Sequence, residues 1–242
     1  MGFEVWGQTD VGLKRKLNED SILIDKDLGL FIVADGMGGH EGGEVASNIA
    51  VNTCQEIINS YKILKSKISP TNLIRECYST ATRKIFQKGQ VESKELMGMG
   101  TTMVMGMIVN GKFYIGNVGD SRCYLYRDNH LWQLTEDHSL VNEQIRAGII
   151  TEDEQHLVSG KNVITRSVGF EENVDVDVFH RRVEDGEIYL LCSDGLCGMV
   201  DDSVIEDILI TKEPEKVVGA CVEAAKQAGG DDNISVIVVR IT

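Results

Sequence analysis

The chain has 242 residues, of which 42% are apolar and 26% charged, a composition typical of a folded globular protein. Its 24 basic and 38 acidic residues give a net charge of −14, which repels nucleic acid and anionic membranes and makes either an unexpected partner. No apolar run approaches the ~20 residues that cross a bilayer, and the amino terminus lacks a basic stretch followed by an apolar one.

Short runs rich in β-branched and aromatic residues predict the strands of this chain. Asn110-Gly111 separates two of these runs and predicts a tight hairpin turn, and Asp128-Asn129 predicts another. Hairpins of this kind indicate antiparallel sheet. The predicted strands cover residues 21–24, 30–34, 102–109, 113–118, 123–127, 187–192 and 234–241.

Helical periodicity falls in blocks between groups of strands and does not follow every strand. This arrangement indicates an α+β fold and not a doubly wound parallel sheet. The predicted helices cover residues 44–64, 69–87, 139–147 and 214–228. On the first helix, the residues expected to face the core are Val45, Ile49, Thr53, Ile57 and Tyr61.

Acidic residues stand at five of the predicted strand boundaries. If their carboxylates converge, they repel one another, and a divalent cation would remove that repulsion. Ligands that are all oxygen favour Mg²⁺ or Mn²⁺ over zinc. The alternative is that each Asp-Gly pair is only a turn, and this pattern alone leaves that alternative open. The motifs are Glu19-Asp20, Asp35-Gly36, Asp120-Ser121, Asp194-Gly195 and Asp231-Asp232-Asn233.

The six cysteines form no C-x-x-C pair, and no cluster of cysteine and histidine has the spacing of a zinc site. We interpret them as reduced thiols of the core. Together with the absence of a leader or an apolar span, they predict a cytoplasmic protein.

The acidic motifs belong to a longer ordered set that extends over nearly the whole chain. The set comprises Thr9-Asp10-Val11-Gly12, Arg15-x-x-Asn18-Glu19-Asp20-Ser21, Asp35-Gly36-Met37-Gly38-Gly39-His40, Gly100-Thr101-Thr102, Gly119-Asp120-Ser121-Arg122, Asp137-His138-Ser139, Thr165-Arg166, Ser193-Asp194-Gly195 and Asp232-Asn233. In this order the motifs resemble the PPM/PP2C-type metal-dependent protein serine/threonine phosphatases in their bacterial form.

The resemblance implies a four-layer α-β-β-α sandwich, in which two packed antiparallel sheets are flanked by helices. It implies a single phosphatase domain over residues 1–242, with metals bound at one end of the sandwich. A variable flap beside the site would cover about residues 140–163 and influence the choice of substrate.

The resemblance also implies the site residues. Asp35, Asp194 and Asp232 would be catalytic through the metals, with Asp35 bridging two ions and the Gly36 carbonyl on one of them. Arg15 would hold the substrate phosphate, because its planar guanidinium suits phosphate oxygens. The metal ligands carried over are Glu19, Asp20, Asp35, Gly36, Asp120, Asp194 and Asp232. The cofactors would be two Mn²⁺ or Mg²⁺ ions, with a third, weaker site at Asp120.

Two positions depart from the family pattern. Many eukaryotic members have a histidine, proposed as the general acid, where this chain has Met37, which cannot give a proton. His40 lies near Met37 in sequence and is a candidate for the general acid, but we favour a structural role for it. The family often has an acidic residue or asparagine four positions after Asp194, where this chain has Gly198, so the ligands of a third metal are in doubt.

The activity implied is hydrolysis of phosphoserine and phosphothreonine in proteins by a metal-activated water. The partners would be phosphorylated proteins, including a Ser/Thr kinase and its substrates, and the default assembly is a monomer. One alternative is a non-catalytic relative that binds phosphoproteins. The other is a two-metal phosphodiesterase or nuclease, which the charge of −14 opposes.

Overall fold

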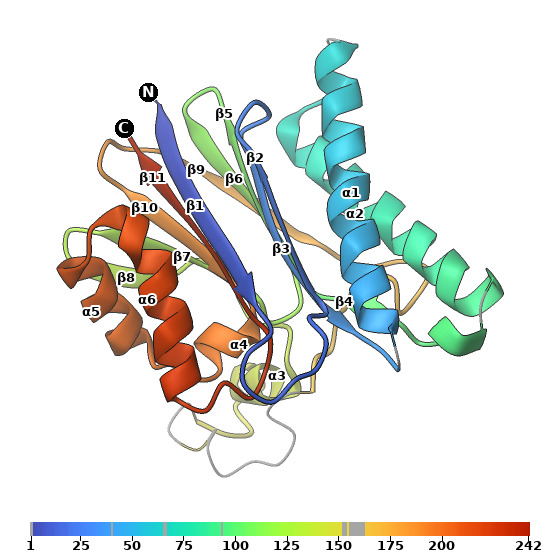
Figure 1. Cartoon of the computed structure of the whole chain (residues 1–242). Coiled ribbons are helices and arrows are strands. Elements are labelled where there is room, and N and C mark those ends of the chain that lie inside the picture. Colours follow the sequence, from blue (N-terminus) through green and yellow to red (C-terminus); the bar gives the residue numbers. More distant parts are fainter. Residues whose placement is uncertain (1, 40, 65–66, 93, 152–153, 155–162) are drawn as a thin grey trace.

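The computed structural model describes residues 2–39, 41–64, 67–92, 94–151, 154 and 163–242. Within these residues, eleven strands form two antiparallel sheets that pack face to face, and helices cover both outer surfaces (Figure 1). This architecture confirms the predicted α-β-β-α sandwich.

The first sheet contains the strands nearest both ends of the chain. Its strands are β1 (Phe3–Asp10), β7 (Arg122–Arg127), β8 (His130–Gln133), β10 (Ile188–Cys192) and β11 (Ile234–Ile241). They lie in the order β1-β11-β10-β7-β8. β1 was not among the predicted strands; it pairs with β11 along its whole length. The predicted turn at Asp128-Asn129 is confirmed, because it joins β7 to β8 with both residues at positive φ.

The second sheet lies in the order β2-β3-β5-β6-β9, with a short strand β4 added to β3. The strands are β2 (Asp20–Asp25), β3 (Leu30–Met37), β4 (Gly100–Thr101), β5 (Met103–Val109), β6 (Lys112–Val118) and β9 (Asp177–Arg182). Asn110 and Gly111 have φ of 51° and 71° and join β5 to β6, so the predicted hairpin is confirmed.

The two sheets are joined by a buried apolar layer that includes aromatic rings from both. Phe113 of the second sheet stacks on Tyr189 of the first, with 3.9 Å between ring centroids. Phe31, of the same sheet as Phe113, lies parallel to it with 6.4 Å between ring centroids. Aromatic side chains bury large areas, so this stack contributes strongly to the attraction between the sheets.

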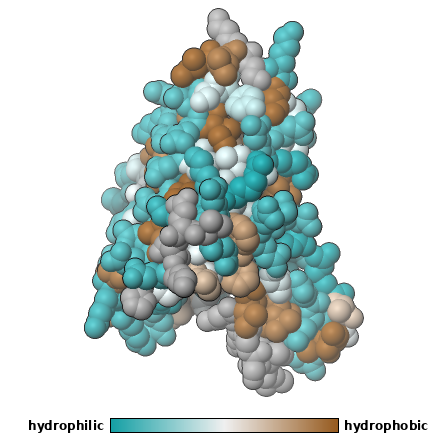
Figure 2. Space-filling model, turned by 90° about the vertical axis from the view of Figure 1, so that its right-hand side faces the viewer, coloured by the Kyte–Doolittle hydropathy of each residue, from teal (hydrophilic) through white to brown (hydrophobic). Residues whose placement is uncertain are grey.

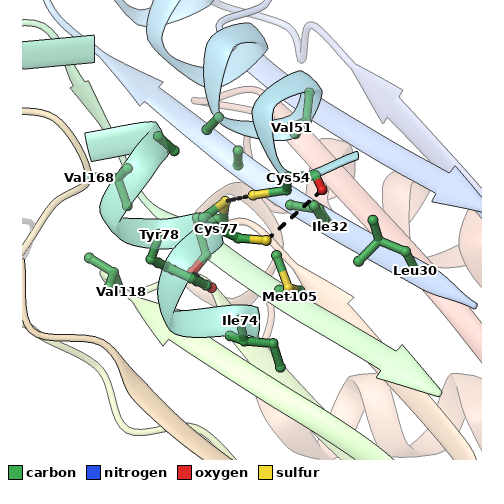
Figure 3. Packing of buried hydrophobic residues seen from close by; sticks show 14 of the residues in the cluster. Leu30, Ile32, Val51, Cys54, Ile74, Cys77, Tyr78, Met105, Val118 and Val168 are labelled. Carbon is green, nitrogen blue, oxygen red and sulfur yellow. Dashed lines mark hydrogen bonds between the residues drawn. The ribbon is translucent and has the colours of Figure 1, made fainter. Parts of the chain in front are cut away.

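Helices α1 (Gly42–Ile63) and α2 (Pro70–Gln87) cover the outer face of the second sheet. Their contact with it is a cluster of buried residues (Figure 3). In this cluster Tyr78 donates a hydrogen bond to the Met103 carbonyl. The predicted helices are confirmed. The predicted stripe of α1 also packs against this cluster, with Thr53 buried and Val45, Ile49, Ile57 and Tyr61 partly buried. The centre of the buried face is formed by Ala46, Ala50 and Cys54, because small residues let a helix approach a sheet closely.

The outer face of the first sheet is covered by α4 (Asp194–Cys197), α5 (Asp202–Thr211) and α6 (Pro214–Gln227). The remaining helical segments are α3 (Leu140–Arg146), η1 (Lys88–Glu92) and η2 (Lys94–Leu96). α3 and α6 match predicted helices, whereas α5 was not predicted. Among the described helices, none combines the length and the apolar character that crossing a membrane requires. All six cysteines are free, as predicted.

The end of the sandwich opposite the chain termini is where the acidic motifs lie. α3 and α4 mark this end in Figure 1. β2 and β11 begin here, whereas β3 and β10 run toward it and end here. The antiparallel arrangement therefore gathers the Asp20, Asp35, Asp194 and Asp232 segments at one edge, although they are far apart in the sequence.

Candidate metal centre

Asp20 and Asp35 come together because they are directly opposite each other in the register of β2 and β3. Residues that face each other in antiparallel strands point their side chains to the same side of the sheet. Asp20 is only 6% exposed, and its Oδ2 accepts a hydrogen bond from Ser193 of the other sheet at 2.9 Å. The pair therefore lies where the ends of the two sheets meet.

Asp194 and Asp232 come from the first sheet and complete the cluster. Asp194 is the first residue of α4, directly after β10, and Asp232 lies just before β11. Burial, followed by repulsion from Asp20 and Asp194, holds the pKa of Asp35 well above its usual value. Burial also raises the pKa of Asp194, and Asp232 adds to this by repulsion. Such mutual effects require the carboxylates to lie close together.

Asp20 and Glu19 respond to the same crowding. Burial raises the pKa of Asp20 to about 7, and repulsion from Asp194 and Asp232 adds to the shift. Burial likewise raises the pKa of Glu19, against the attraction of Arg15. The cluster therefore favours protons, or cations, that would offset its charge.

Several of these oxygens are buried without any hydrogen-bond donor. Among the described residues, Glu19 Oε1, Asp20 Oδ1 and Asp194 Oδ1 have no hydrogen-bond partner. An unpaired buried carboxylate oxygen is costly unless a cation or a donor meets it. All three are oxygen atoms, which are the ligands that Mg²⁺ and Mn²⁺ prefer. The donor set therefore fits divalent metal ions.

Two glycines keep space open beside these oxygens. A Cβ at Gly43 would collide with Glu19 Oε1 and with the Gly36 carbonyl oxygen, so both oxygens border the same small space. A Cβ at Gly36 would in turn collide with the Gly43 carbonyl. A larger residue at either position would therefore fill or distort the space beside Glu19. This explains why Asp35 is followed by glycine.

Arg15 already supplies a positive charge to the cluster. Its guanidinium donates to Asp232 Oδ2 at 2.7 Å and lies 3.8 Å from Glu19 Oε2. In the part of the chain that the structure describes, no three acidic, histidine or cysteine side chains are arranged as a complete metal site. Binding a metal therefore requires side-chain adjustment, and Arg15 must share or release Asp232.

Asp120 lies beside the cluster on a turn that is held from two sides. Burial raises its pKa to about 7, and repulsion from Asp194 contributes. The preceding residue, Gly119, donates its N–H to His138 Nδ1 at 3.1 Å and accepts from the His138 N–H at 3.0 Å. Burial, followed by the nearby Arg166, lowers the pKa of His138, which favours the neutral ring that this acceptor role requires.

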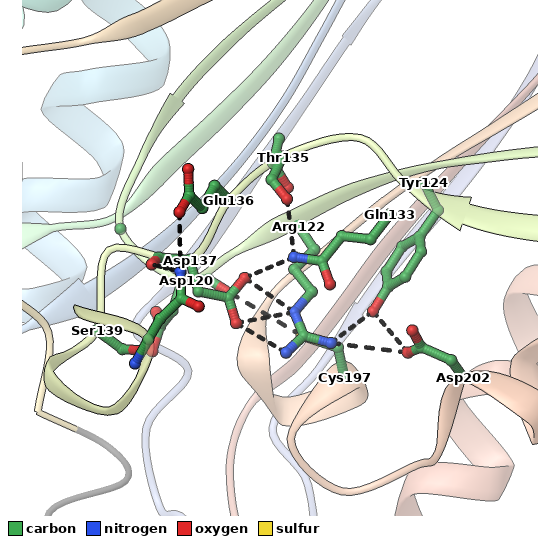
Figure 4. Close-up of polar contacts among 12 residues, drawn as sticks. Asp120, Arg122, Tyr124, Gln133, Thr135, Glu136, Asp137, Ser139, Cys197 and Asp202 are labelled. Atoms are coloured by element: carbon green, nitrogen blue, oxygen red, sulfur yellow. Dashed lines mark hydrogen bonds and ion pairs between the residues drawn. The ribbon is translucent and has the colours of Figure 1, made fainter. Parts of the chain in front are cut away.

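A polar network supports the same turn from the first sheet (Figure 4). Arg122 donates to both carboxylate oxygens of Asp137, and its other nitrogen donates to the Tyr124 hydroxyl. Tyr124 in turn donates to Asp202 at the start of α5. Bidentate arginine–carboxylate pairs hold geometry firmly, so the segment that carries Asp137 and His138 is fixed to β7, which Tyr124 in turn joins to α5.

The predicted site residues thus fall into two groups. Arg15 and five acidic residues meet at the cluster, together with the Gly36 carbonyl, whereas Asp120 lies beside it. Gly198 offers no carboxylate to Asp120; its N–H closes the turn on the Asp194 carbonyl at 2.7 Å. His40 lies outside the described residues, as do residues 152–153 and 155–162 of the predicted flap. The residues of the cluster are Arg15, Glu19, Asp20, Asp35, Asp194 and Asp232.

Sequence reasoning gave no role to three residues that organise the cluster. Ser193 donates to Asp20, and Asn233 accepts from the Glu19 N–H at 2.8 Å. Asn233 also donates to the carbonyls of Val11 and Leu17, which anchors the loop that carries Arg15. Ser193 and Asn233 could have been noticed in the sequence, because each lies next to an acidic residue of a motif. The third residue is His138, and only its place in the Asp137-His138-Ser139 motif pointed to it.

Comparison with known proteins identifies this arrangement. A family model described as protein phosphatase 2C matches residues 14–212. The chain belongs to this family. The serine/threonine phosphatase stp of Listeria welshimeri is 38% identical over 237 residues, covering 96% of this chain and 94% of that protein. The protein phosphatase PhpP of Streptococcus pneumoniae is 37% identical over 241 residues, covering 96% and 95%.

Solved structures of protein phosphatase 2C relatives share the fold over the whole chain. The Mycobacterium tuberculosis serine/threonine phosphatase PstP/Ppp superposes with a TM-score of 0.92 at 30% identity, covering 100% of this chain and 99% of that one. The catalytic domain of PstP in complex with two manganese ions gives 0.87 at 30% identity, covering 99% of each. The chain is accordingly a metal-dependent Ser/Thr protein phosphatase.

Proposed function

We propose that this phosphatase removes phosphate from phosphoserine and phosphothreonine in proteins by means of water activated at a centre of two Mn²⁺ or Mg²⁺ ions. The observation that carries the proposal is the meeting of carboxylates from both sheets, with buried oxygens that have no hydrogen-bond partner among the described residues. A relative of the same fold, PstP, was crystallised with two manganese ions.

In this proposal Asp35, the Gly36 carbonyl, Asp194 and Asp232 would hold the two ions. When bound, such ions offset the carboxylate repulsion and lower the pKa of a coordinated water. Glu19 and Asp20 line the centre. Asp120 would hold a third, weaker ion, without help from a carboxylate at position 198.

Arg15 would bind the phosphate group of the substrate. Its side chain is exposed and already lies against Asp232 and Glu19. Its planar donors match two phosphate oxygens at once, which a lysine cannot do. Removing the guanidinium should raise KM more than it lowers kcat. Arg15→Lys should recover only part of the loss, because it keeps the charge but not the paired donors.

The leaving alkoxide also needs a proton. Met37 ends β3 beside the cluster and has none to donate. The proton must therefore come from another group or from solvent water, in contrast to family members that have a histidine at this position.

We further propose the setting in which this activity operates. Residues 1–242 would act as one phosphatase domain, monomeric and cytoplasmic, with the segment of about residues 140–163 affecting substrate choice. The partners would be phosphorylated proteins, including a Ser/Thr kinase that the enzyme opposes and the substrates of that kinase. The net charge of −14 supports a role without nucleic acid or a membrane.

The test is turnover of a phosphothreonine peptide with Mn²⁺ and with EDTA. We expect Asp35→Asn to lower turnover on the order of 10³-fold, since metal activation contributes several kcal/mol. Asp27→Asn is the matched control, because Asp27 is exposed in the β2–β3 turn at the opposite end. Equal turnover by the wild type and both variants, or turnover unaffected by EDTA, would contradict the proposal.

A further inference from the structure

A cavity opens beside the metal centre. Its volume is about 410 Å³, and Met37 forms one wall while the other walls come from the segment 164–175. Met37 follows Asp35 by two residues on β3. Strand residues advance about 3.3 Å each, which separates Met37 from Asp35 by about 7 Å along the strand.

The cavity is built on hydrogen-bonded backbone. Val168 exchanges two backbone hydrogen bonds with Thr101 of β4, at 2.8 and 3.0 Å. Gly100 of β4 pairs with Met37, and a Cβ at Gly100 would touch both Met37 Cε and Ser167 Oγ at 3.4 Å. The segment that forms the cavity is therefore attached to β3 through β4, and its position relative to Asp35 is fixed.

Four of the ten residues that line the cavity carry large apolar side chains. Phe170 lines the cavity and is 53% exposed, so its ring is accessible to a bound group. Met37, Ile164 and Val174 are half-buried around the same space. On the α1–α2 side of the molecule, apolar surface gathers at the upper tip and at the lower end, where the cluster lies (Figure 2).

The charged residues that line the cavity disfavour the binding of a phosphate group there, in addition to the one at the metal centre. The Arg166 side chain is already engaged, since its NH1 lies 3.3 Å from Asp177 Oδ1 and 3.2 Å from His138 Nε2. Glu171 and Asp175 stand exposed among the other lining residues and repel anions. An apolar group is therefore the better occupant.

We propose that this cavity is a substrate subsite that binds a large aliphatic or aromatic side chain two residues away from the phosphorylated Ser or Thr. The inference rests on the proposed function. In an extended peptide, residues two apart lie about 7 Å from each other and point to the same side. That spacing matches the distance along β3 from Asp35 to Met37.

The experiment compares phosphothreonine peptides that carry Leu or Ala at each position within three residues of the phosphothreonine. Wild-type enzyme with Mn²⁺ should prefer Leu two residues away, on one side, by roughly tenfold in kcat/KM, the usual gain from filling an apolar pocket. Phe170→Ala should reduce this preference below about twofold, whereas Phe170→Leu should keep most of it.

Two controls separate the subsite from general damage. Turnover of the phosphothreonine peptide that carries only Ala beside the phosphothreonine, and so has no large side chain to fill the cavity, should change far less than that of the Leu peptide in both Phe170 variants. Trp132→Ala removes an exposed aromatic residue of the other sheet and should leave the peptide preference intact.

The outcomes distinguish the two proposals. No turnover of any phosphate ester with Mn²⁺ would overturn the proposed function and the subsite with it. Normal turnover of p-nitrophenyl phosphate without a Leu preference in the wild type would overturn the subsite alone. So would a preference that survives in Phe170→Ala.

Discussion

Strand β10 has a buried carboxylate at each of its ends, and the two are stabilised in opposite ways. Glu187 precedes the strand and is 2% exposed; it lies 2.8 Å from Arg181 NH2 and accepts from the Tyr189 hydroxyl. Asp194 follows the strand, and its neighbours Asp35 and Asp232 are acidic themselves. The chain supplies the cation at one end, whereas at the other it presents several carboxylates to a single arginine.

This difference separates a structural ion pair from a functional cluster. A buried charge with a well-placed partner is stable, but repelling carboxylates persist only where the fold holds them together. The apolar stack between the sheets, with the strand pairing, provides that support. The comparison predicts opposite results for activity and stability when either carboxylate is replaced.

The largest expected effect is at the acidic end. Asp194→Asn should lower Mn²⁺-dependent turnover on the order of 10³-fold. In EDTA the same variant should be as stable as the wild type or more stable, because one source of repulsion is gone. Turnover and thermal unfolding in EDTA measure the two effects. A variant that unfolds several degrees earlier in EDTA would show that Asp194 has a structural role.

At the other end of β10 the reverse should hold. Glu187→Gln leaves Arg181 without its buried partner, which costs roughly 3–5 kcal/mol of unfolding free energy. The melting temperature should fall by about 10 °C. Turnover per folded molecule at 25 °C should stay near the wild-type value. Loss of activity without loss of stability would contradict the contrast drawn here.

Metal binding should offset the repulsion at the acidic end alone. Mn²⁺ at a hundred times its dissociation constant stabilises a folded protein by about 2.7 kcal/mol, which is a rise of about 5–10 °C in melting temperature for a chain of this size. The rise should appear in the wild type and in Glu187→Gln, and should be largely lost in Asp35→Asn. An equal rise in all three would place Mn²⁺ elsewhere.

The last expected effect is a dependence on pH in the metal-free protein. Burial raises the pKa of Asp20 to about 7, whereas an unfolded Asp titrates near about 3.9. Between these values the folded state holds a proton that the unfolded chain has released, so this group costs stability as pH rises. The stability of Asp20→Asn relative to wild type should therefore grow from about pH 4 to about pH 8 in urea unfolding with EDTA. A constant difference would contradict the raised pKa.

Much of the fold could be predicted from local patterns. Asn110-Gly111 predicted the β5–β6 hairpin. The start of the helix predicted over residues 69–87 is also confirmed, because Ser69 accepts a hydrogen bond from the Asn72 N–H where α2 begins. β1 and β9 were missed because their polar residues lower the apolar signal and their hydrogen bonds come from distant strands. On α1 the predicted stripe packs against the core, but the small residues at the centre of the buried face, Ala46, Ala50 and Cys54, were not predicted because hydropathy favours bulky residues.

The candidate site shows the same division. The acidic residues could be found from their strand-end positions and from the ordered motifs. The pairing of Asp20 with Asp35 could not be found, because register depends on contacts between strands. The contact of Ser193 with Asp20 depends on how two sheets meet. The cavity beside Met37 could not be predicted from the sequence, since its walls come from segments about 130 residues apart.

The most direct test of the central claim is calorimetric titration of the metal-free protein with Mn²⁺. The carboxylate cluster predicts two ions bound per chain in the wild type and fewer in Asp35→Asn, with Asp27→Asn unchanged. No binding to the wild type, or the same number of ions in Asp35→Asn, would contradict the claim that these carboxylates hold the metal ions.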